Sequence, residues 1–444
     1  MDETYLIREE EMHFFNLISI DEVGEVFEWR GKILRGITEE ARPLVDRYFS
    51  SGFLDTLVEK GYFPKTEISH YTNPKYCYIL EHERIELQTI DAEWSFDMLK
   101  DAALLVCEIA AIAWSYGFNM KDCHTKNVLF KNNKPVYVDL GSFVEIEEGT
   151  SGFKSYDQIQ SYYYYVLQLW SDGFISLPKQ LQCLYRFEKR DYLLYKYPVF
   201  RYLNRILQAY LSIEGTLFLL TTSTFESTIV KKSKCRIVLW KLLNKTKPFK
   251  WQRPNIFFKK LKKIQRPQLL SVEFPTNLRF EFNENVVQML DSYKDYLVVN
   301  PMQFGFLDSM LEKMGNKHII TVDYNECKGN VNYLKYRNKG IPLTNLSFNM
   351  SYPVVHYNYQ TPPQNRIKAS AFIVIGARDI VTEQNKPLEV LYKTLLDYDF
   401  NSLVVVELRE NSCTGDEEHN IGIWYSLEKT EYNGEFVITV YKKK

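Results

Sequence analysis

Apolar and polar positions alternate with a period of two in the segment 24–37, GEVFEWRGKILRGI, around a polar corner. This alternation predicts a β-hairpin with its turn near Arg30 and Gly31. In the segment 38–63 the apolar residues fall instead at helical spacing, which a proline and a Ser-Ser-Gly triplet interrupt. The apolar run at 76–86 ends in charged residues and predicts a strand that leads into a linker.

The segment 95–118 has the clearest helical pattern in the chain. Ser95 can cap its start and Gly117 can end it. Between them, apolar side chains recur at helical spacing and form one broad face: Met98, Leu99, Ala102, Leu105, Val106, Ile109 and Ile112. Two short strands are expected next, within 121–143, and then a Tyr- and Leu-rich helical region up to about residue 250.

The pattern changes after residue 285. Helical patterns now separate short apolar, β-branched runs, which lie at 296–300, 318–325, 369–376 and 402–408. Alternation of buried strands with helices predicts a parallel α/β sheet covered by helices on both faces. The final segment, 422–443, predicts a hairpin around Asn433 and Gly434.

Length and composition limit the class of protein. A chain of 444 residues is too long for one ordinary core, so two or three domains are expected. A net charge of −1 excludes a global field that would recruit nucleic acid. Seven scattered cysteines without a CxxC pair predict a reduced, cytoplasmic protein without a structural metal. The acidic start is unlike a signal peptide, and no run reaches the ~18 apolar residues of a membrane span.

Basic residues concentrate in the segment 231–266, which contains 14 Lys or Arg and no Asp or Glu. Such a segment is either a solvated linker between domains or a surface for anionic lipid heads or a phosphorylated partner. No nucleic-acid recognition motif accompanies the charge. The expected location is therefore cytoplasmic, with peripheral attachment to the inner face of the membrane as the alternative.

The stretch KDCHTKNVLFKNNKPVYVDLGSF, residues 121–143, carries the strongest chemical signal. A loop, strand, turn, strand, loop unit brings Asp122, Asn127 and Asp139 to the same end of a hairpin. Phosphoryl transfer needs oxygen ligands for Mg²⁺ and a carboxylate near the attacking oxygen. A purely structural alternative is that these residues cap loops and turns.

The spacing D-x-H-x-x-N-V-L-F followed by DLG resembles the centre of kinase-like phosphotransferases, especially those acting on small molecules. The resemblance implies that Asp122 orients or deprotonates an acceptor hydroxyl, that His124 adds a proton donor, and that Asn127 and Asp139 hold Mg²⁺ against the phosphates of ATP.

The phosphate-binding parts depart from that pattern. The hairpin at 24–37 has no G-x-G-x-x-G motif, and the expected lysine is replaced by Arg35, with Lys32 close by. Glu39 or Glu40 could pair with either cation. Arginine binds phosphate as a planar fork rather than as a point charge.

A wider resemblance covers about 70–290. The stretches LEHERI (80–85), EWSFDMLKDAALL (93–105) and PVYVDLGSF (135–143) resemble bacterial class I SAM-dependent methyltransferases of the nodulation-protein type, often associated with surface polysaccharide genes. The resemblance implies an α+β protein-kinase-like domain at 1–230, a basic linker or helical extension at 231–285, and an α/β Rossmann-like, methyltransferase-type domain at 286–444.

In that second domain the resemblance implies a SAM site at the carboxyl ends of the first strands. Asp323 would bind the ribose hydroxyls, and Asn345 would stand near adenine. Gly305 is the one glycine in the turn after the first strand, VVNPMQFGF. Glu407 would be an acid facing the substrate.

Three functions stay open. The first is an ATP- and Mg²⁺-dependent phosphotransferase acting on a sugar or surface-polysaccharide intermediate, fused to a degenerate methyltransferase domain. The second is a SAM-dependent methyltransferase of a glycan or lipid-linked sugar. The third is a non-catalytic scaffold in polysaccharide biosynthesis. The acceptor and the oligomeric state have no sequence signal.

Overall fold

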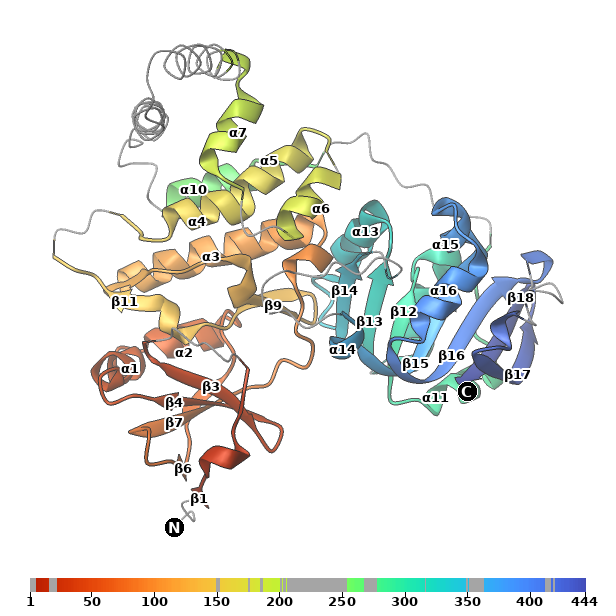
Figure 1. Cartoon of the computed structure of the whole chain (residues 1–444), viewed down its shortest axis with the longest axis horizontal. Coiled ribbons are helices and arrows are strands. Elements are labelled where there is room, and N and C mark those ends of the chain that lie inside the picture. The colour runs from red at the N-terminus through yellow and green to blue at the C-terminus, as the bar shows by residue number, and fades with distance from the viewer. Residues whose placement is uncertain are drawn as a thin grey trace, which may run out of the picture.

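The chain forms two units that lie side by side (Figure 1): a first unit of residues 5–266 and a second unit of residues 278–444. The structure is a computed structural model. It describes residues 5–15, 22–148, 152–174, 176–183, 187–199, 202, 205, 254–266, 278–315, 317–348, 350, 363–411, 417 and 420–444.

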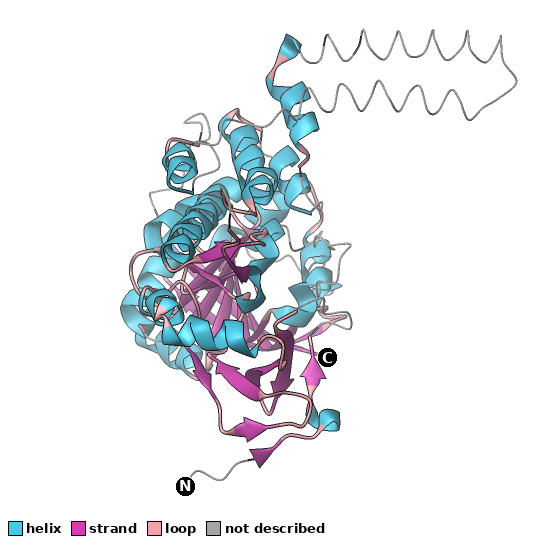
Figure 2. Ribbon diagram, turned by 90° about the vertical axis from the view of Figure 1, so that its left-hand side faces the viewer, coloured by secondary structure: helices cyan, strands magenta, loops and turns pink. Residues whose placement is uncertain are grey.

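A five-stranded antiparallel sheet opens the first unit, in the order β2-β3-β4-β7-β5. Figure 2 shows these strands at the end of the molecule near the N-terminus. The strands are β2 (His13–Phe14), β3 (Gly24–Trp29), β4 (Lys32–Ile37), β5 (Thr66–Ile68) and β7 (Tyr78–His82), and a separate pair joins β1 (Tyr5–Leu6) to β6 (Tyr71–Thr72). Helices α1 (Arg42–Ser50) and α2 (Phe53–Glu59) follow β4. The predicted hairpin is confirmed, because Arg30 and Gly31 form its turn with φ of 49° and 78°.

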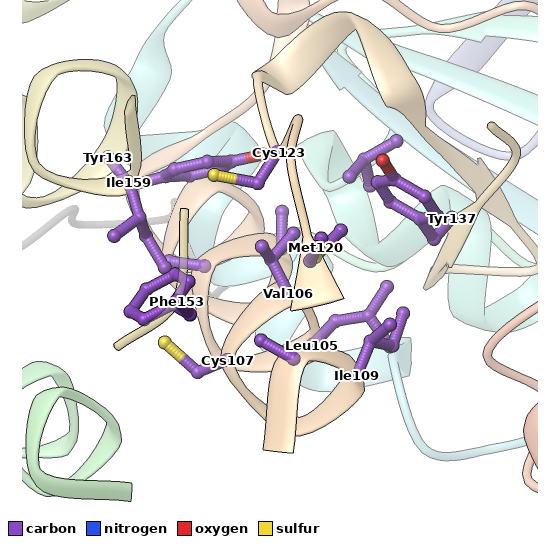
Figure 3. Packing of buried hydrophobic residues seen from close by; sticks show 14 of the residues in the cluster. Leu105, Val106, Cys107, Ile109, Met120, Cys123, Tyr137, Phe153, Ile159 and Tyr163 are labelled. Carbon is purple, nitrogen blue, oxygen red and sulfur yellow. The ribbon is translucent and has the colours of Figure 1, made fainter. Parts of the chain in front are cut away.

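The rest of the first unit is built around α3 (Phe96–Ser115). Two short antiparallel pairs pack near it, β8 (Phe118–Met120) with β11 (Phe143–Glu145), and β9 (Val128–Lys131) with β10 (Lys134–Tyr137). The helices beyond them are α4 (Tyr156–Ile159), α5 (Tyr165–Ser171), α6 (Ser176–Cys183) and α7 (Lys189–Lys196). Figure 3 shows side chains of α3 such as Val106 and Ile109 among buried neighbours that include Met120, Tyr137 and Tyr163.

The second unit is a seven-stranded sheet in the order β14-β13-β12-β15-β16-β18-β17. Five strands are parallel: β12 (Asp295–Val299), β13 (His318–Asp323), β14 (Leu343–Ser347), β15 (Lys368–Ile375) and β16 (Asp399–Leu408). An antiparallel hairpin of β17 (Tyr425–Asn433) and β18 (Phe436–Lys443) adds to β16. The predicted alternation and the predicted final hairpin are both confirmed.

Helices cover both faces of this sheet (Figure 1). Side chains of α11 (Glu284–Asp291) and α12 (Phe306–Met314) share one buried cluster with alternate strand residues, and those of α15 (Ala377–Glu383) and α16 (Leu388–Leu395) share another. The remaining helices are α13 (Glu326–Tyr336) and α14 (Pro363–Arg366). Two buried faces explain why the strand segments read as continuous apolar runs.

Within the predicted linker or helical extension at 231–285, the structure describes residues 254–266 and 278–285. Helix α10 (Pro254–Lys262) packs on α3 and buries Phe257 and Leu261 in the core of the first unit. Phe280 and Phe282 belong to the core of the second unit. The part of the basic segment at 231–253 lies outside the described residues. Within the described chain, no helix is long and apolar enough to cross a bilayer.

Side chains of the second unit cap the N-terminus of α3. The Phe96 amide donates to Glu326 Oε1 at 3.0 Å, and the Asp97 amide donates to Asn330 Oδ1 at 2.8 Å. Ser95 occupies the predicted N-cap position, but its Oγ is buried with no hydrogen-bond partner among the described residues and makes no capping hydrogen bond. A long-range contact therefore replaces the local cap that the sequence suggested.

Further polar contacts join the units. Tyr333 of α13 and Arg337, directly after this helix, both donate to Asp101 of α3 at 2.7 Å. Arg366 pairs with Glu93, and the two side chains are only 5% and 2% exposed. Buried and charge-assisted contacts of this kind fix one relative arrangement of the two units.

Candidate functional site

Asn127 and Asp139 meet at one end of the β9–β10 hairpin. Asn127 Nδ2 donates to Asp139 Oδ2 at 3.0 Å, and Ser142 Oγ donates to the same oxygen. The Gly141 amide donates to Asp139 Oδ1, also at 3.0 Å. The structure thus brings these two residues together as the sequence predicted, while their role as metal ligands stays a prediction.

Asp122 and His124 lie on the loop just before this hairpin. His124 Nε2 is 3.3 Å from Asp122 Oδ2. Burial acts to raise the pKa of Asp122, but hydrogen bonds from His124 and Gln158 outweigh it and lower that pKa. Tyr137 Oη donates to the Asp122 carbonyl at 2.9 Å and accepts from Asn127 Nδ2 at 3.3 Å, which ties the loop to the Asn127–Asp139 pair.

Arg35, rather than Lys32, reaches this cluster. Its guanidinium Nη2 is 3.7 Å from Asp139 Oδ1, and its side chain is 4% exposed. Lys32 instead forms an ion pair with Glu81 of β7 at 2.8 Å. Glu39 pairs with Arg42 at 3.6 Å, and the predicted pairing of Glu39 or Glu40 with Arg35 or Lys32 stays a prediction.

Asn127 and Asp139 offer an amide and a carboxylate oxygen, which are suitable ligands for Mg²⁺. No three His, Cys, Asp or Glu side chains gather as a metal site within the part of the chain that the structure describes. A Mg²⁺ ion here would therefore need further oxygen ligands, from water or from phosphate, to complete its shell.

The carboxyl ends of β12 and β13 form a second candidate site. The backbone amide of Asn300 donates to the Val322 carbonyl at 3.0 Å, so Asn300 lies next to the end of β13. Asn300 and Asp323 are both 0% exposed. Among the described residues, no group donates to Asn300 Oδ1 or to Asp323 Oδ1. Two buried acceptor oxygens without donors are costly unless a further group supplies them.

Burial raises the pKa of Asp323 to about 7. A hydrogen bond from Asn332 Nδ2, at 3.3 Å, and the charge of Lys328 act in the opposite direction. The carboxyl group of Asp323 therefore changes its protonation state near neutral pH. Because the side chain is fully buried, a ligand reaches it only when neighbouring side chains shift.

The turn after β12 has an unusual backbone. Asn300, Phe304 and Gly305 all have positive φ, at 58°, 55° and 61°. This region is costly for a bulky residue such as Phe304, and strain of this kind clusters at binding sites. A Cβ on Gly305 would lie 3.6 Å from Arg279 Cγ, which is ordinary contact. The predicted contact of Gly305 with a cofactor stays a prediction.

Asn345 does not lie where an adenine contact was expected. It sits inside β14, where its Nδ2 donates to Thr321 Oγ1 at 2.6 Å and its backbone amide donates to Asn133 Oδ1 at 2.8 Å. Asn133 Nδ2 donates in turn to Asn345 Oδ1. The adenine prediction is therefore wrong, because both ends of this amide side chain are occupied by protein groups.

Glu407 lies near the carboxyl end of β16 and is 6% exposed. Its Oε1 accepts from the Arg378 amide at 3.0 Å, and burial raises its pKa to about 7. Nearby, Gln303 Nε2 donates to Asp379 Oδ2 at 2.8 Å.

Sequence reasoning missed Asn300, Gln303 and Asp379, although a polar residue directly after a buried strand could have singled out Asn300.

Comparisons with known proteins give one partial relative among curated sequences and partial matches among solved structures. No family model matches the chain. The nodulation protein NoeA of Rhizobium meliloti (strain 1021) is 28% identical over 134 residues, which cover 29% of this chain and 28% of that protein. The matched part thus spans less than a third of the length of the curated relative.

Solved methyltransferases resemble about a third of the chain. The 16S rRNA methylase RmtB has 14% identity and a TM-score of 0.27, covering 36% of this chain and 61% of its own. A SAM-dependent methyltransferase from Aquifex aeolicus has 12% identity and a TM-score of 0.25, covering 36% and 98%. TrmK of M. capricolum, in complex with S-adenosyl-homocysteine, has 9% identity and a TM-score of 0.25, covering 37% and 70%.

The strand order of the second unit carries the fold assignment by itself. Five parallel strands lie in the order β14-β13-β12-β15-β16. Successive strands are added on one side of β12 up to β14, and on the other side of β12 from β15 onward. Ligands of such open α/β sheets bind outside the carboxyl ends of the strands at that switch point. The second unit is thus a Rossmann-like α/β domain.

Proposed function

We propose that the second unit binds SAM and transfers its methyl group to an acceptor. One observation carries the proposal: Asn300 Oδ1 and Asp323 Oδ1 are buried acceptors without a donor among the described residues, and they lie at the ends of adjacent central strands. SAM is rich in donors, with two ribose hydroxyls, an ammonium group and an amino group on adenine. Donation from such groups would offset the desolvation of both oxygens.

The strained turn after β12 supports the same location. Asn300 and Phe304 hold left-handed backbone conformations there, and strain of this kind persists where a site needs a particular geometry. SAM would supply an activated methyl group. Glu407 and Asp379 would provide carboxyl groups near the neighbouring strand ends, where an acceptor hydroxyl could be oriented or deprotonated. A small molecule or glycan is the acceptor class that we propose.

Titration calorimetry of the full chain with SAM, and separately with S-adenosyl-homocysteine, tests this function. We expect saturable binding of both ligands, because they share the ribose and amino groups that would donate to Asp323 and Asn300. Absence of heat at millimolar SAM, from folded protein, would remove the proposal.

A second candidate function rests on the first unit. We propose a nucleotide site in which Asn127 and Asp139 hold Mg²⁺ and Arg35 faces the phosphates of ATP, with Asp122 and His124 beside the acceptor. The observation that favours it is the convergence of a buried cation and two oxygen ligands from separate elements, with Arg35 3.7 Å from Asp139. Phosphoryl transfer depends on such positioned charges.

Replacing Asp139 by Ala is expected to weaken binding of ATP·Mg²⁺ by at least about tenfold, or about 1.4 kcal/mol, because one of two metal ligands is lost. Calorimetry with ATP, in Mg²⁺ and in EDTA, measures the effect. Asp55→Ala, on the exposed side of α2, is the matched control. Equal affinity of Asp139→Ala and the unaltered chain would contradict the proposed site.

We also propose that α10 faces an anionic lipid surface. Its inner side buries Phe257 and Leu261. Its outer side exposes Ile256, Lys259 and Lys262, and the turn that follows exposes Lys263. An apolar side chain among lysines suits the interface of a membrane that carries negative charge.

The triple change Lys259→Glu, Lys262→Glu and Lys263→Glu is expected to reduce binding to vesicles that contain phosphatidylglycerol by about 100-fold, from about 1 kcal/mol for each lysine. Co-sedimentation with these vesicles and with pure phosphatidylcholine measures the loss. Lys313→Glu, Lys339→Glu and Lys393→Glu, on the second unit, form the control triple. Equal binding of both triples would contradict the proposed surface.

A further inference from the structure

A buried chain of polar side chains connects the first unit to Asp323. It starts at Asn133, in the turn between β9 and β10, and continues through Asn345 of β14, Thr321 of β13 and Asn332 of α13. All five side chains belong to residues that are no more than 1% exposed. Buried networks of this kind are costly to keep unless each member orients the next.

These hydrogen bonds fix the direction of each side-chain amide. Asn133 Nδ2 donates to Asn345 Oδ1, which leaves Asn345 Nδ2 aimed at Thr321 Oγ1 at 2.6 Å. Asn332 Nδ2 then lies between two acceptors, 3.2 Å from Thr321 Oγ1 and 3.3 Å from Asp323 Oδ2. Without the donor from Asn133, only the hydrogen bond to Thr321 holds the side-chain amide of Asn345 in this orientation.

Asn133 also completes the edge of the second sheet. Strand β14 is the terminal strand of that sheet, and its Asn345 amide donates outward to Asn133 Oδ1 at 2.8 Å. A buried amide at a sheet edge needs such a partner. One side chain of the first unit thus serves both the backbone and the side chain of Asn345.

We infer that Asn133, a residue of the first unit, is a positioning residue for Asp323 in the candidate SAM site of the second unit. The inference rests on the proposed function. It implies that the second unit alone holds its acid less well than the full chain does, and that Asn133 acts without touching the cofactor.

The turn offers a closely matched pair of variants. Asn132 and Asn133 both have positive φ, at 50° and 60°, so glycine is tolerated equally well at either position. Asn133→Gly removes the contact with Asn345, whereas Asn132→Gly keeps it. In the full chain, we expect Asn133→Gly to weaken SAM binding about three- to thirty-fold and Asn132→Gly to leave it unchanged.

A pH profile separates positioning from general damage. SAM binding to the unaltered chain is expected to strengthen as Asp323 loses its proton near neutral pH. The groups that act on Asp323 besides Asn332 are Lys328 of α13 and Tyr324, and neither variant changes them. Asn133→Gly should move the midpoint to higher pH, because Asn332 then stabilises the carboxylate less well.

Hydrogen exchange gives a readout that needs no SAM. Asn133→Gly should lower protection of the Asn345 amide and of amides in α13, and Asn132→Gly should not. Loss confined to β14, or SAM binding and a pH midpoint equal to those of the unaltered chain, would overturn the inference. If the unaltered chain binds no SAM, the proposed function fails, and the exchange in α13 alone decides whether Asn133 positions this region.

Discussion

Asp323→Asn is expected to stabilise the ligand-free protein at pH 8 and to weaken SAM binding at the same time. The pKa of Asp323 is about 7 in the folded chain and about 3.9 in an unfolded one. The folded state therefore favours the protonated acid, and this contribution to stability is lost as pH rises from about 4 to about 7. Three pKa units correspond to roughly 4 kcal/mol above pH 7.

Urea unfolding at several pH values tests the stability half of this prediction. The difference in the free energy of unfolding between Asp323→Asn and the unaltered chain should be small at pH 4 and reach a few kcal/mol at pH 8. Calorimetry tests the other half: loss of charge-assisted hydrogen bonds, at about 1.5–3 kcal/mol each, should reduce SAM affinity at least about tenfold.

Glu407→Gln is the matched control for Asp323→Asn. Burial also raises the pKa of Glu407 to about 7, so this variant should gain stability over a similar pH range. It lies at the end of β16 rather than β13, and its SAM affinity should stay unchanged. A SAM affinity of Asp323→Asn equal to that of the unaltered chain would show that this acid does not bind the cofactor.

Glu93→Ala is expected to cost about 3–5 kcal/mol of stability, because it leaves the Arg366 guanidinium buried between the units without its carboxylate. The measurement is urea unfolding followed by tryptophan fluorescence. The double variant Glu93→Leu and Arg366→Met should recover part of the loss, since apolar groups of similar volume need no partner.

Asp399→Ala provides the comparison for this ion pair. Asp399 pairs with Lys368 at 3.2 Å, but those side chains are 66% and 64% exposed, so the loss should stay below about 1 kcal/mol. A loss below about 1 kcal/mol for Glu93→Ala as well would mean that the pair between the units contributes little. The inferred rigid arrangement of the two units would then lack its main support.

Local patterns in the sequence predicted the elements well. The hairpin at 24–37, the long helix α3 and the strands β12, β13, β15 and β16 all follow from periodicity and turn residues, which act over a few positions. The same holds for Asn127 and Asp139, because a single short hairpin brings them together.

Contacts between distant segments could not be predicted in this way. Spacing shows nothing of the contact between Asn133 and Asn345, so Asn345 looked available for a ligand. Ser95 was predicted to cap the helix because it directly precedes the apolar helical pattern. The side chains that accept from the first amides of the helix come from the second unit. Helix α10 falls in the segment predicted as a basic linker or helical extension, and its lysines gave no sign that Phe257 and Leu261 pack into the core of the first unit.

The cap of α3 has a consequence for the time during which the protein is made. Its two partners, Glu326 and Asn330, follow Phe96 and Asp97 by 230 and 233 positions in the chain. At about 5–20 residues per second, a ribosome needs on the order of 10–50 s to reach them. During that interval the amides of Phe96 and Asp97 lack the side-chain acceptors that the second unit later supplies.

The surface of the first unit that later contacts the second unit carries three carboxylates. Glu93, Asp97 and Asp101 all lie on it, and each later receives a donor from the second unit. Water solvates these three carboxylates well until the second unit reaches them. The arriving second unit brings Arg337 and Arg366 to that face, and the attraction between opposite charges guides the two units together.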